Sequence, residues 1–225
     1  MELFTPEKIR LLLLFAPVFI LSLSFHEYAH AWSANRLGDS TARYLGRMTM
    51  DPMSHISWFG TVLFPAISLL TGAPLFGWAN PVPVDMRNFR KPRLHMAIVA
   101  AAGPASNLVL AVICTAVLSF VIHSSTGVSV SVGQVGMRGA AIEMLTMAVQ
   151  MNLFLAFFNL LPVPPLDGSR IVQGFVSSRT AEWIDRYAFQ GQMILLALFI
   201  FGILRILAVP VYGVQMGLFE LFGLR

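Results

Sequence analysis

Charged residues are scarce in this sequence. Only 12% of its 225 residues are Asp, Glu, Lys or Arg, whereas 56% are hydrophobic and the mean hydropathy is +0.73. Globular domains typically carry about 25% charged residues, roughly twice this share. The composition therefore excludes an ordinary soluble domain and indicates an integral membrane protein, whose chemistry lies in or against the bilayer.

Cysteine is almost absent, since Cys114 is the only one in the chain and lies inside an apolar run. A disulfide framework is therefore excluded, and core packing is the role that we expect for this thiol. Acidic residues are fewer than basic ones, with 11 Asp+Glu against 15 Lys+Arg. In a membrane protein, this excess indicates loops retained in the cytoplasm rather than a nucleic-acid partner.

The sequence also lacks internal repeats and low-complexity segments. Lys8 and Arg10 precede an apolar stretch, as in a signal peptide, but no small-residue cleavage pattern follows. We therefore expect an uncleaved first span and a single integral-membrane domain over residues 1–225.

Long apolar segments predict an all-α, polytopic membrane bundle of about four to six spans. The clearest segments are residues 9–35, 94–122, 139–161 and 190–207, the last with a candidate extension to Leu221. Residues 58–76 are long enough to cross but contain two glycines and two prolines. We expect a short helix or a re-entrant hairpin there.

Positive charge predicts the orientation of these spans. Basic residues gather in 36–93 and 170–186, whereas residues 123–135 contain no Lys or Arg. Because cytoplasmic loops carry an excess of Lys and Arg, both basic segments should be cytoplasmic. The first and third spans then both end at the cytoplasmic face, where their C-terminal ends meet.

Two histidines and a glutamate lie in the last third of the first span, in the sequence HEYAH. His26 and His30 are four residues apart, so both rings leave one face of a helix and can bind one metal ion. Glu27 can then take a proton from the water that a catalytic zinc activates, and return it to a leaving amine. Such groups cost at least about 2.5–3.5 kcal/mol at the centre of a span, so they indicate a partner or a function. The alternative is structural, with imidazoles bonded across helices and the glutamate paired with an arginine.

A catalytic zinc normally has three protein ligands and one water, so the motif requires a third ligand at the same depth. Asp167 follows the third span at the end that should approach the histidines, after Pro162, Pro164 and Pro165. These prolines interrupt the helix, and unwound backbone at membrane depth is tolerated where it lines a polar cavity. We therefore favour Asp167 as the third ligand over its alternative role as a helix N-cap.

Other candidate ligands suit the site less well. His55, His95 and His123 lie in loops or at span ends, where a surface or interfacial histidine is the simpler interpretation. Glu143 lies near the start of the third span, which the predicted topology places on the far side from the motif.

Four stretches together indicate a family. They are HEYAH, NLLPVPPLDG at 159–168, GWANPVPV at 77–84 and AAGPASN at 101–107. This combination resembles the site-2 protease family of intramembrane zinc metalloproteases, in its compact bacterial and archaeal form without a PDZ or CBS domain. The core, residues 9–175, carries both metal motifs, and residues 176–225 contribute the C-terminal span or spans.

The resemblance implies a role for each matching position. His26, His30 and Asp167 match the ligands of one Zn²⁺ per chain, and Glu27 matches the general base. Asn159 resembles an asparagine that helps to hold the substrate backbone, with an interhelical hydrogen bond as its alternative role.

Residues 77–84 resemble a membrane-associated strand that receives the unwound substrate. An edge strand can pair with an exposed backbone, and the prolines at 81 and 83 fit an edge position. An irregular loop on the bilayer surface is the alternative. The predicted substrate-binding residues are Asn159, Pro162, Pro164, Gly77, Trp78, Asn80 and Val82.

Larger members of the family carry a peptide-binding domain between the second and third core spans, or a nucleotide-sensing module at the C-terminus. Residues 123–135 are too few for such a domain. We expect control by partners, by membrane-embedded loops or by prior cleavage of the substrate.

These features predict a multi-pass metalloendopeptidase of the cell membrane with its active site toward the cytoplasm. Its expected partners are transmembrane protein substrates, the lipid bilayer and a regulatory membrane protein, and a homo-oligomer is left open. The alternatives are a membrane metal-ion transporter and a catalytically inactive membrane-binding scaffold. A transporter would need polar groups along a path, but residues 94–122 contain no carboxylate.

Overall fold

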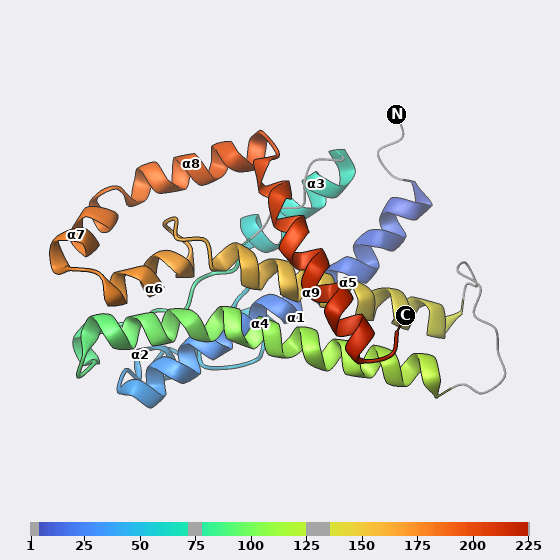
Figure 1. Cartoon of the computed structure of the whole chain (residues 1–225), viewed down its shortest axis with the longest axis horizontal. Coiled ribbons are helices and arrows are strands. Elements are labelled where there is room, and N and C mark those ends of the chain that lie inside the picture. The colour runs from blue at the N-terminus through green and yellow to red at the C-terminus, as the bar shows by residue number, and fades with distance from the viewer. Residues whose placement is uncertain (1–4, 72–77, 125–135, 225) are drawn as a thin grey trace.

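The computed structural model describes residues 5–71, 78–124 and 136–224. Within these ranges every regular element is helical, and Figure 1 shows a bundle elongated along one axis. In the same ranges, four helices are long and apolar enough to cross a membrane: α1 (Pro6–Leu37), α4 (Pro92–His123), α5 (Met137–Asn159) and Ile203–Leu221. The described residues thus confirm the all-α prediction, and the four candidate spans agree with the predicted multi-pass membrane protein.

The first span, α1, begins and ends at strong helix signals. The Thr5 hydroxyl accepts a hydrogen bond from the Lys8 N–H, and Pro6 occupies the first helical position. At the other end, Gly38 adopts a φ of 114° and its N–H bonds to the carbonyls of Ala34 and Asn35. The chain therefore turns sharply just after the histidine motif.

α4 is the central helix, because it packs against α1, α5 and α6 (Asp167–Phe175). α1 and α5 run in the same direction beside it. Near their N-termini, Arg10 of α1 pairs with Glu143 of α5. Near their middles, the Asn152 amide donates to the Ser22 hydroxyl. The C-terminal ends of the first and third spans therefore lie at the same end of the bundle, as predicted.

The two basic segments also lie together. Arg93, at the start of α4, donates hydrogen bonds to the Gln173 carbonyl in α6 and to the hydroxyl of Ser178, where α7 (Ser178–Arg186) begins. Figure 1 shows α6, α7 and the start of α4 at one end of the bundle.

The segment between the first two spans is a short helix in its described part. A π-helical stretch, Trp58–Leu63, continues as α3 (Phe64–Thr71). This agrees with the predicted short helix, although part of the 58–76 segment lies outside the described residues. A four-residue helix, α2 (Thr41–Tyr44), follows the end of α1.

The prediction of a fourth span over residues 190–207 is wrong. α8 (Ala188–Ile200) ends before Gly202, which adopts a φ of 70°. A 3-10 turn, Ile203–Leu207, and α9 (Ala208–Leu221) follow, and the candidate span is Ile203–Leu221. The whole stretch is apolar, so hydropathy does not reveal the left-handed glycine that ends α8.

Candidate metal centre

The two histidines of HEYAH face one point. His26 and His30 are both buried on α1, and their ring centroids are 4.7 Å apart. The two Nε2 atoms are 3.0 Å apart. The i and i+4 spacing therefore produces the paired imidazoles that the sequence predicts.

Asp167 completes the group. Its Oδ2 atom lies 3.1 Å from His26 Nε2 and 3.4 Å from His30 Nε2. Leu166, rather than Asp167, is the N-cap residue of α6, and no side chain caps the helix. The N-cap alternative for Asp167 is therefore wrong, and its carboxylate points at both histidines.

The distances between His26 Nε2, His30 Nε2 and Asp167 Oδ2 fit the coordination of one zinc ion. Two ligands that each lie about 2.0–2.1 Å from a tetrahedral ion are about 3.3–3.4 Å apart, close to the separations found here. Asp167 Oδ2 is buried and accepts no hydrogen bond from a described group. Two imidazoles and a carboxylate are a common donor set for catalytic zinc, and they leave one coordination position open. The group formed by His26, His30 and Asp167 is hereafter called the metal cluster.

A hydrogen bond at Nδ1 orients each imidazole ring. His26 Nδ1 lies 2.6 Å from Asn107 Oδ1, and His30 Nδ1 lies 2.8 Å from the Val99 carbonyl oxygen, both in α4. With the proton on Nδ1, each ring donates to its oxygen partner and presents an unprotonated Nε2 to the cluster. α4 thus sets the tautomer and the orientation of both rings.

The amide of Asn107 extends this support to the third span. Its Nδ2 donates to Asn152 Oδ1 at 2.8 Å and to the Ser22 carbonyl at 3.3 Å. Asn107 and Asn152 are both buried. Neither residue was predicted to have a role, although an amide side chain in an apolar span is itself a signal of an interhelical hydrogen bond.

Gly103 allows α4 to approach the metal cluster. A Cβ atom at this position would lie 2.4 Å from His30 Nε2 and 2.6 Å from His26 Cε1. α4 remains one helix through Pro104. The glycine of the AAGPASN stretch therefore provides the space in which the rings lie.

Glu27 faces a different part of the chain. Its Oε2 accepts a hydrogen bond of 2.8 Å from the Val82 N–H. The carboxylate therefore leaves α1 beside the cluster and contacts Val82, within residues 77–84, which were predicted to receive the substrate. The arginine pairing considered as a structural role for Glu27 is not found among the described ion pairs.

The predicted strand over residues 77–84 is not formed in the part that the structure describes, residues 78–84, while Gly77 lies outside it. The segment is held by separate contacts: Trp78 N–H donates to Gly60 O, Asn80 N–H donates to His55 O, and Arg47 donates to the Asn80 carbonyl. Pro81 and Pro83 have no N–H, and the Val82 N–H is bonded to Glu27. The segment therefore lacks the regular donors that a β-ladder requires.

Asp39 anchors the far end of this segment to α1. It is buried and accepts hydrogen bonds from the Thr41 hydroxyl, the Asp85 N–H and the Asn88 amide. Burial raises the pKa of Asp39, but these hydrogen bonds outweigh that effect and hold the pKa below its usual range. The carboxylate thus stays charged and fixes the segment against the end of the motif helix.

The remaining predicted substrate residues lie around the break between α5 and α6. Asn159 is the last residue of α5 and donates to the Leu155 carbonyl of the same helix, so its predicted alternative, an interhelical bond, is wrong. Pro162 and Pro164 lie in the connection that follows. Gly168 lets this connection fold back, since a Cβ there would lie 2.3 Å from the Leu160 carbonyl oxygen.

The other histidines stay outside the metal cluster. His55 is buried, and its Nε2 bonds to the Thr49 carbonyl, so the interpretation of it as a surface or interfacial residue is wrong. His95 packs edge-on against Phe89, and His123 is exposed at the end of α4.

Comparison with known proteins supports this arrangement. The family model described as Peptidase family M50 matches residues 14–203. "Putative zinc metalloprotease YwhC" of Bacillus subtilis is 39% identical over 181 residues, which are 80% of this chain and 77% of that protein. "Putative zinc metalloprotease Rip2" of Mycobacterium tuberculosis strain H37Rv is 28% identical over 208 residues, 91% of this chain and 72% of that protein. No solved structure matches the chain.

The family match spans both stretches that supply the metal cluster, α1 from residue 14 and the connection into α6. The relatives named above carry zinc in their names, in agreement with the donor set of the cluster. The resemblance found in the sequence is confirmed: the chain belongs to Peptidase family M50, the site-2 protease family of zinc metalloproteases.

Proposed function

We propose that this protein is an intramembrane zinc endopeptidase, which hydrolyses a peptide bond in or near the transmembrane segment of a membrane protein. The observation that carries the proposal is the position of the metal cluster. His26 and His30 lie on a candidate span, are supported by a second one, and meet Asp167 at the end of a third. A site so placed is reached from within the bilayer.

Each residue near the cluster has a proposed part in hydrolysis. When bound, a zinc ion supplies a Lewis acid that activates water and polarises a carbonyl oxygen. Glu27 accepts the proton of the attacking water and delivers it to the leaving amine. Val82 holds one oxygen of this carboxylate, and no described group bonds to the other, which is therefore open to a proton.

The substrate must be extended before it can react, because a helical peptide bond has its carbonyl engaged. Residues 77–84 are proposed to receive it. Since the Val82 N–H contacts Glu27, a backbone lying along Trp78, Asn80 and Val82 would pass beside the catalytic carboxylate. Gly77, Asn159, Pro162 and Pro164 are proposed to complete this binding region.

The active site is proposed to open toward the cytoplasm. The support is the contact of Arg93 with α6 and α7, which brings the two basic segments to the end of the bundle nearest Asp167. Transmembrane proteins are the proposed substrates, and a regulatory membrane protein is a proposed partner.

A Glu27→Gln variant tests the proposal. The amide cannot accept the proton, so we expect cleavage of a transmembrane test substrate in proteoliposomes to fall by about three or more orders of magnitude while zinc stays bound. Cleavage is measured by mass spectrometry and bound zinc by elemental analysis.

A chelator added to the wild-type protein should abolish cleavage, and zinc should restore it. Wild-type rates in the Glu27→Gln variant would remove Glu27 from its role. Zinc flux into the proteoliposomes without any cleavage would instead favour a transporter.

A further inference from the structure

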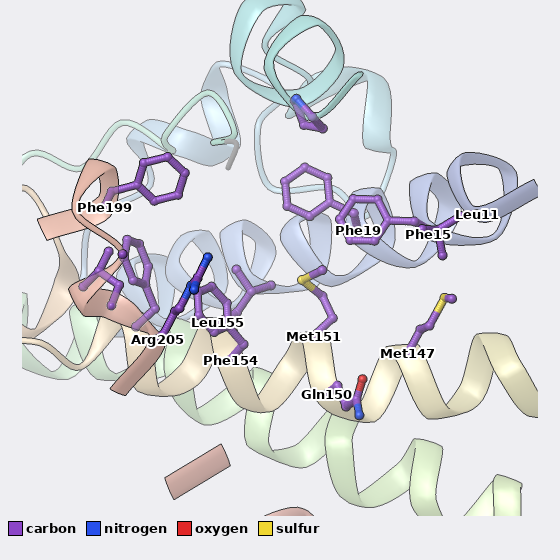
Figure 2. Close-up of a pocket in the computed structure, with 14 residues that line it drawn as sticks. Leu11, Phe15, Phe19, Met147, Gln150, Met151, Phe154, Leu155, Phe199 and Arg205 are labelled. Atoms are coloured by element: carbon purple, nitrogen blue, oxygen red, sulfur yellow. The ribbon is translucent and has the colours of Figure 1, made fainter. Parts of the chain in front are cut away.

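A cavity of about 450 Å³ lies between α1, α5 and the turn that follows α8. Figure 2 shows its aromatic and aliphatic walls, which include Phe15 and Phe19 of α1 and Met151 and Phe154 of α5. Cavities of about 300–1,000 Å³ are typical of ligand sites. This one lies among membrane-spanning helices, so its occupant is largely apolar.

The cavity borders the metal centre. One buried cluster contains the cavity residues Phe19 and Leu155 together with Leu23 and Ala79. Leu23 lies one helical turn before Glu27, and Ala79 belongs to the segment that contacts Glu27 through Val82. A chain segment seated in the cavity would therefore be continuous with the proposed binding region for the extended substrate.

Arg205 gives this apolar cavity a charge. It lies within the candidate span Ile203–Leu221 and lines the cavity. Figure 2 shows the Arg205 side chain at the cavity wall, with its guanidinium end toward the cavity. Arg205 is exposed near the start of this span, so its charge is accessible to a ligand seated in the cavity.

Two other arginines at the spans are paired within the chain. Arg10 pairs with Glu143, and Arg138 donates to the carbonyls of Val121 and Ile122. Among the described residues, no side chain or carbonyl pairs with the guanidinium of Arg205. The guanidinium is therefore available to an anionic group that lies outside the described part of the chain.

We infer that Arg205 binds an acidic side chain in the transmembrane segment of the substrate, and that the cavity holds the neighbouring apolar face of that segment. The inference rests on the proposed function. A carboxylate complements the planar guanidinium by two parallel hydrogen bonds, which are strong where water is excluded. Arg205 thereby selects transmembrane segments that carry Asp or Glu near the cut site.

Binding to a cleavage-deficient protein tests this inference. The zinc-loaded Glu27→Gln protein, full length and in phosphatidylcholine nanodiscs, is titrated with labelled Leu-Ala peptides of about 25 residues. Each peptide carries one Glu, placed in turn at every position of two successive helical turns, and each has a matched peptide with Gln there.

At one or more positions, we expect the Glu peptide to bind about ten- to a hundredfold more tightly than its Gln partner. Adding Arg205→Gln should abolish this preference, whereas Arg205→Lys should keep part of it. Arg179→Gln, which removes an exposed charge from α7 away from the cavity, should leave the preference unchanged.

A Glu preference that persists in the Arg205→Gln protein, or equal binding of all peptides, would overturn the inference. So would a preference that disappears in phosphatidylglycerol nanodiscs, because an anionic lipid would then be the preferred ligand of Arg205. The assay needs no turnover, so failure of the wild-type protein to cleave would count against the proposed function separately from this result.

Discussion

The side chain of Asn107 in α4 forms hydrogen bonds with both α1 and α5. Its carbonyl oxygen accepts from His26 of α1, and its amide group donates to Asn152 of α5 and to the Ser22 carbonyl. A buried polar side chain left without partners costs about 1–3 kcal/mol. The network therefore orients a proposed zinc ligand and also selects one register for α1, α4 and α5.

Replacing Asn107 tests its role in orienting His26. In Asn107→Leu, His26 Nδ1 loses its acceptor and Asn152 Oδ1 loses its donor, so we expect zinc affinity to fall about 10–100-fold. Competition against a fluorescent chelator measures this affinity. Ser106→Ala is the matched control, because the Ser106 hydroxyl bonds only to the Gly103 carbonyl of its own helix. Unchanged zinc affinity in Asn107→Leu would show that the bond to His26 contributes nothing to metal binding.

At the scale of elements, the metal cluster depends on the break between α5 and α6 and on the close packing of α4 against α1. The prolines after α5 end it where Asp167 must meet the histidines, and Gly168 lets the connection fold back. α4 supports both imidazoles from a distance that only a glycine at position 103 allows. Each of these features places a side chain that hydropathy alone would not locate.

Gly103→Ala tests the close approach of α4 and α1. The new Cβ would lie 2.4 Å from His30 Nε2, so the imidazoles or α4 must move. We expect at least about a tenfold loss of zinc affinity, measured by zinc content after dialysis against graded chelator. Gly213→Ala is the control, since a Cβ there would have no atom of another described element within 4 Å. Equal zinc content in the two variants would mean that the cluster tolerates the displacement.

At the scale of the whole molecule, charged residues mark the two ends of the helical bundle. Arg93 joins the start of α4 to α6 and α7, whereas His123 and the Arg10–Glu143 pair lie toward the opposite end of the helices. The proposed orientation puts the first of these ends in the cytoplasm.

Cysteine labelling tests this orientation. In a Cys114→Ser background, we expect Arg179→Cys to react with an impermeant maleimide only after cells are opened, and His123→Cys to react in intact cells. Both positions are exposed. Labelling of both in intact cells, or the reverse pattern, would contradict the cytoplasmic placement of the active site.

Local features of the sequence determined most of the spans and the residues of the metal cluster. Apolar segments longer than a bilayer predicted three of the four spans close to their observed bounds, and the i, i+4 spacing of His26 and His30 predicted their shared face. Asp167 could be found because the proline break and the orientation of the third span restricted where a third ligand could lie.

Only the tertiary structure decided how these parts are held together. His26 and Asn107 are 81 residues apart, and Glu27 and Val82 are 55 apart. Such pairs depend on which helix faces meet, and helical periodicity does not specify this. The same reason explains the missed break at Gly202 and the position of Arg205 at the cavity, where no described residue pairs with it. A single apolar run contains both, and their meaning comes from the helices packed around them.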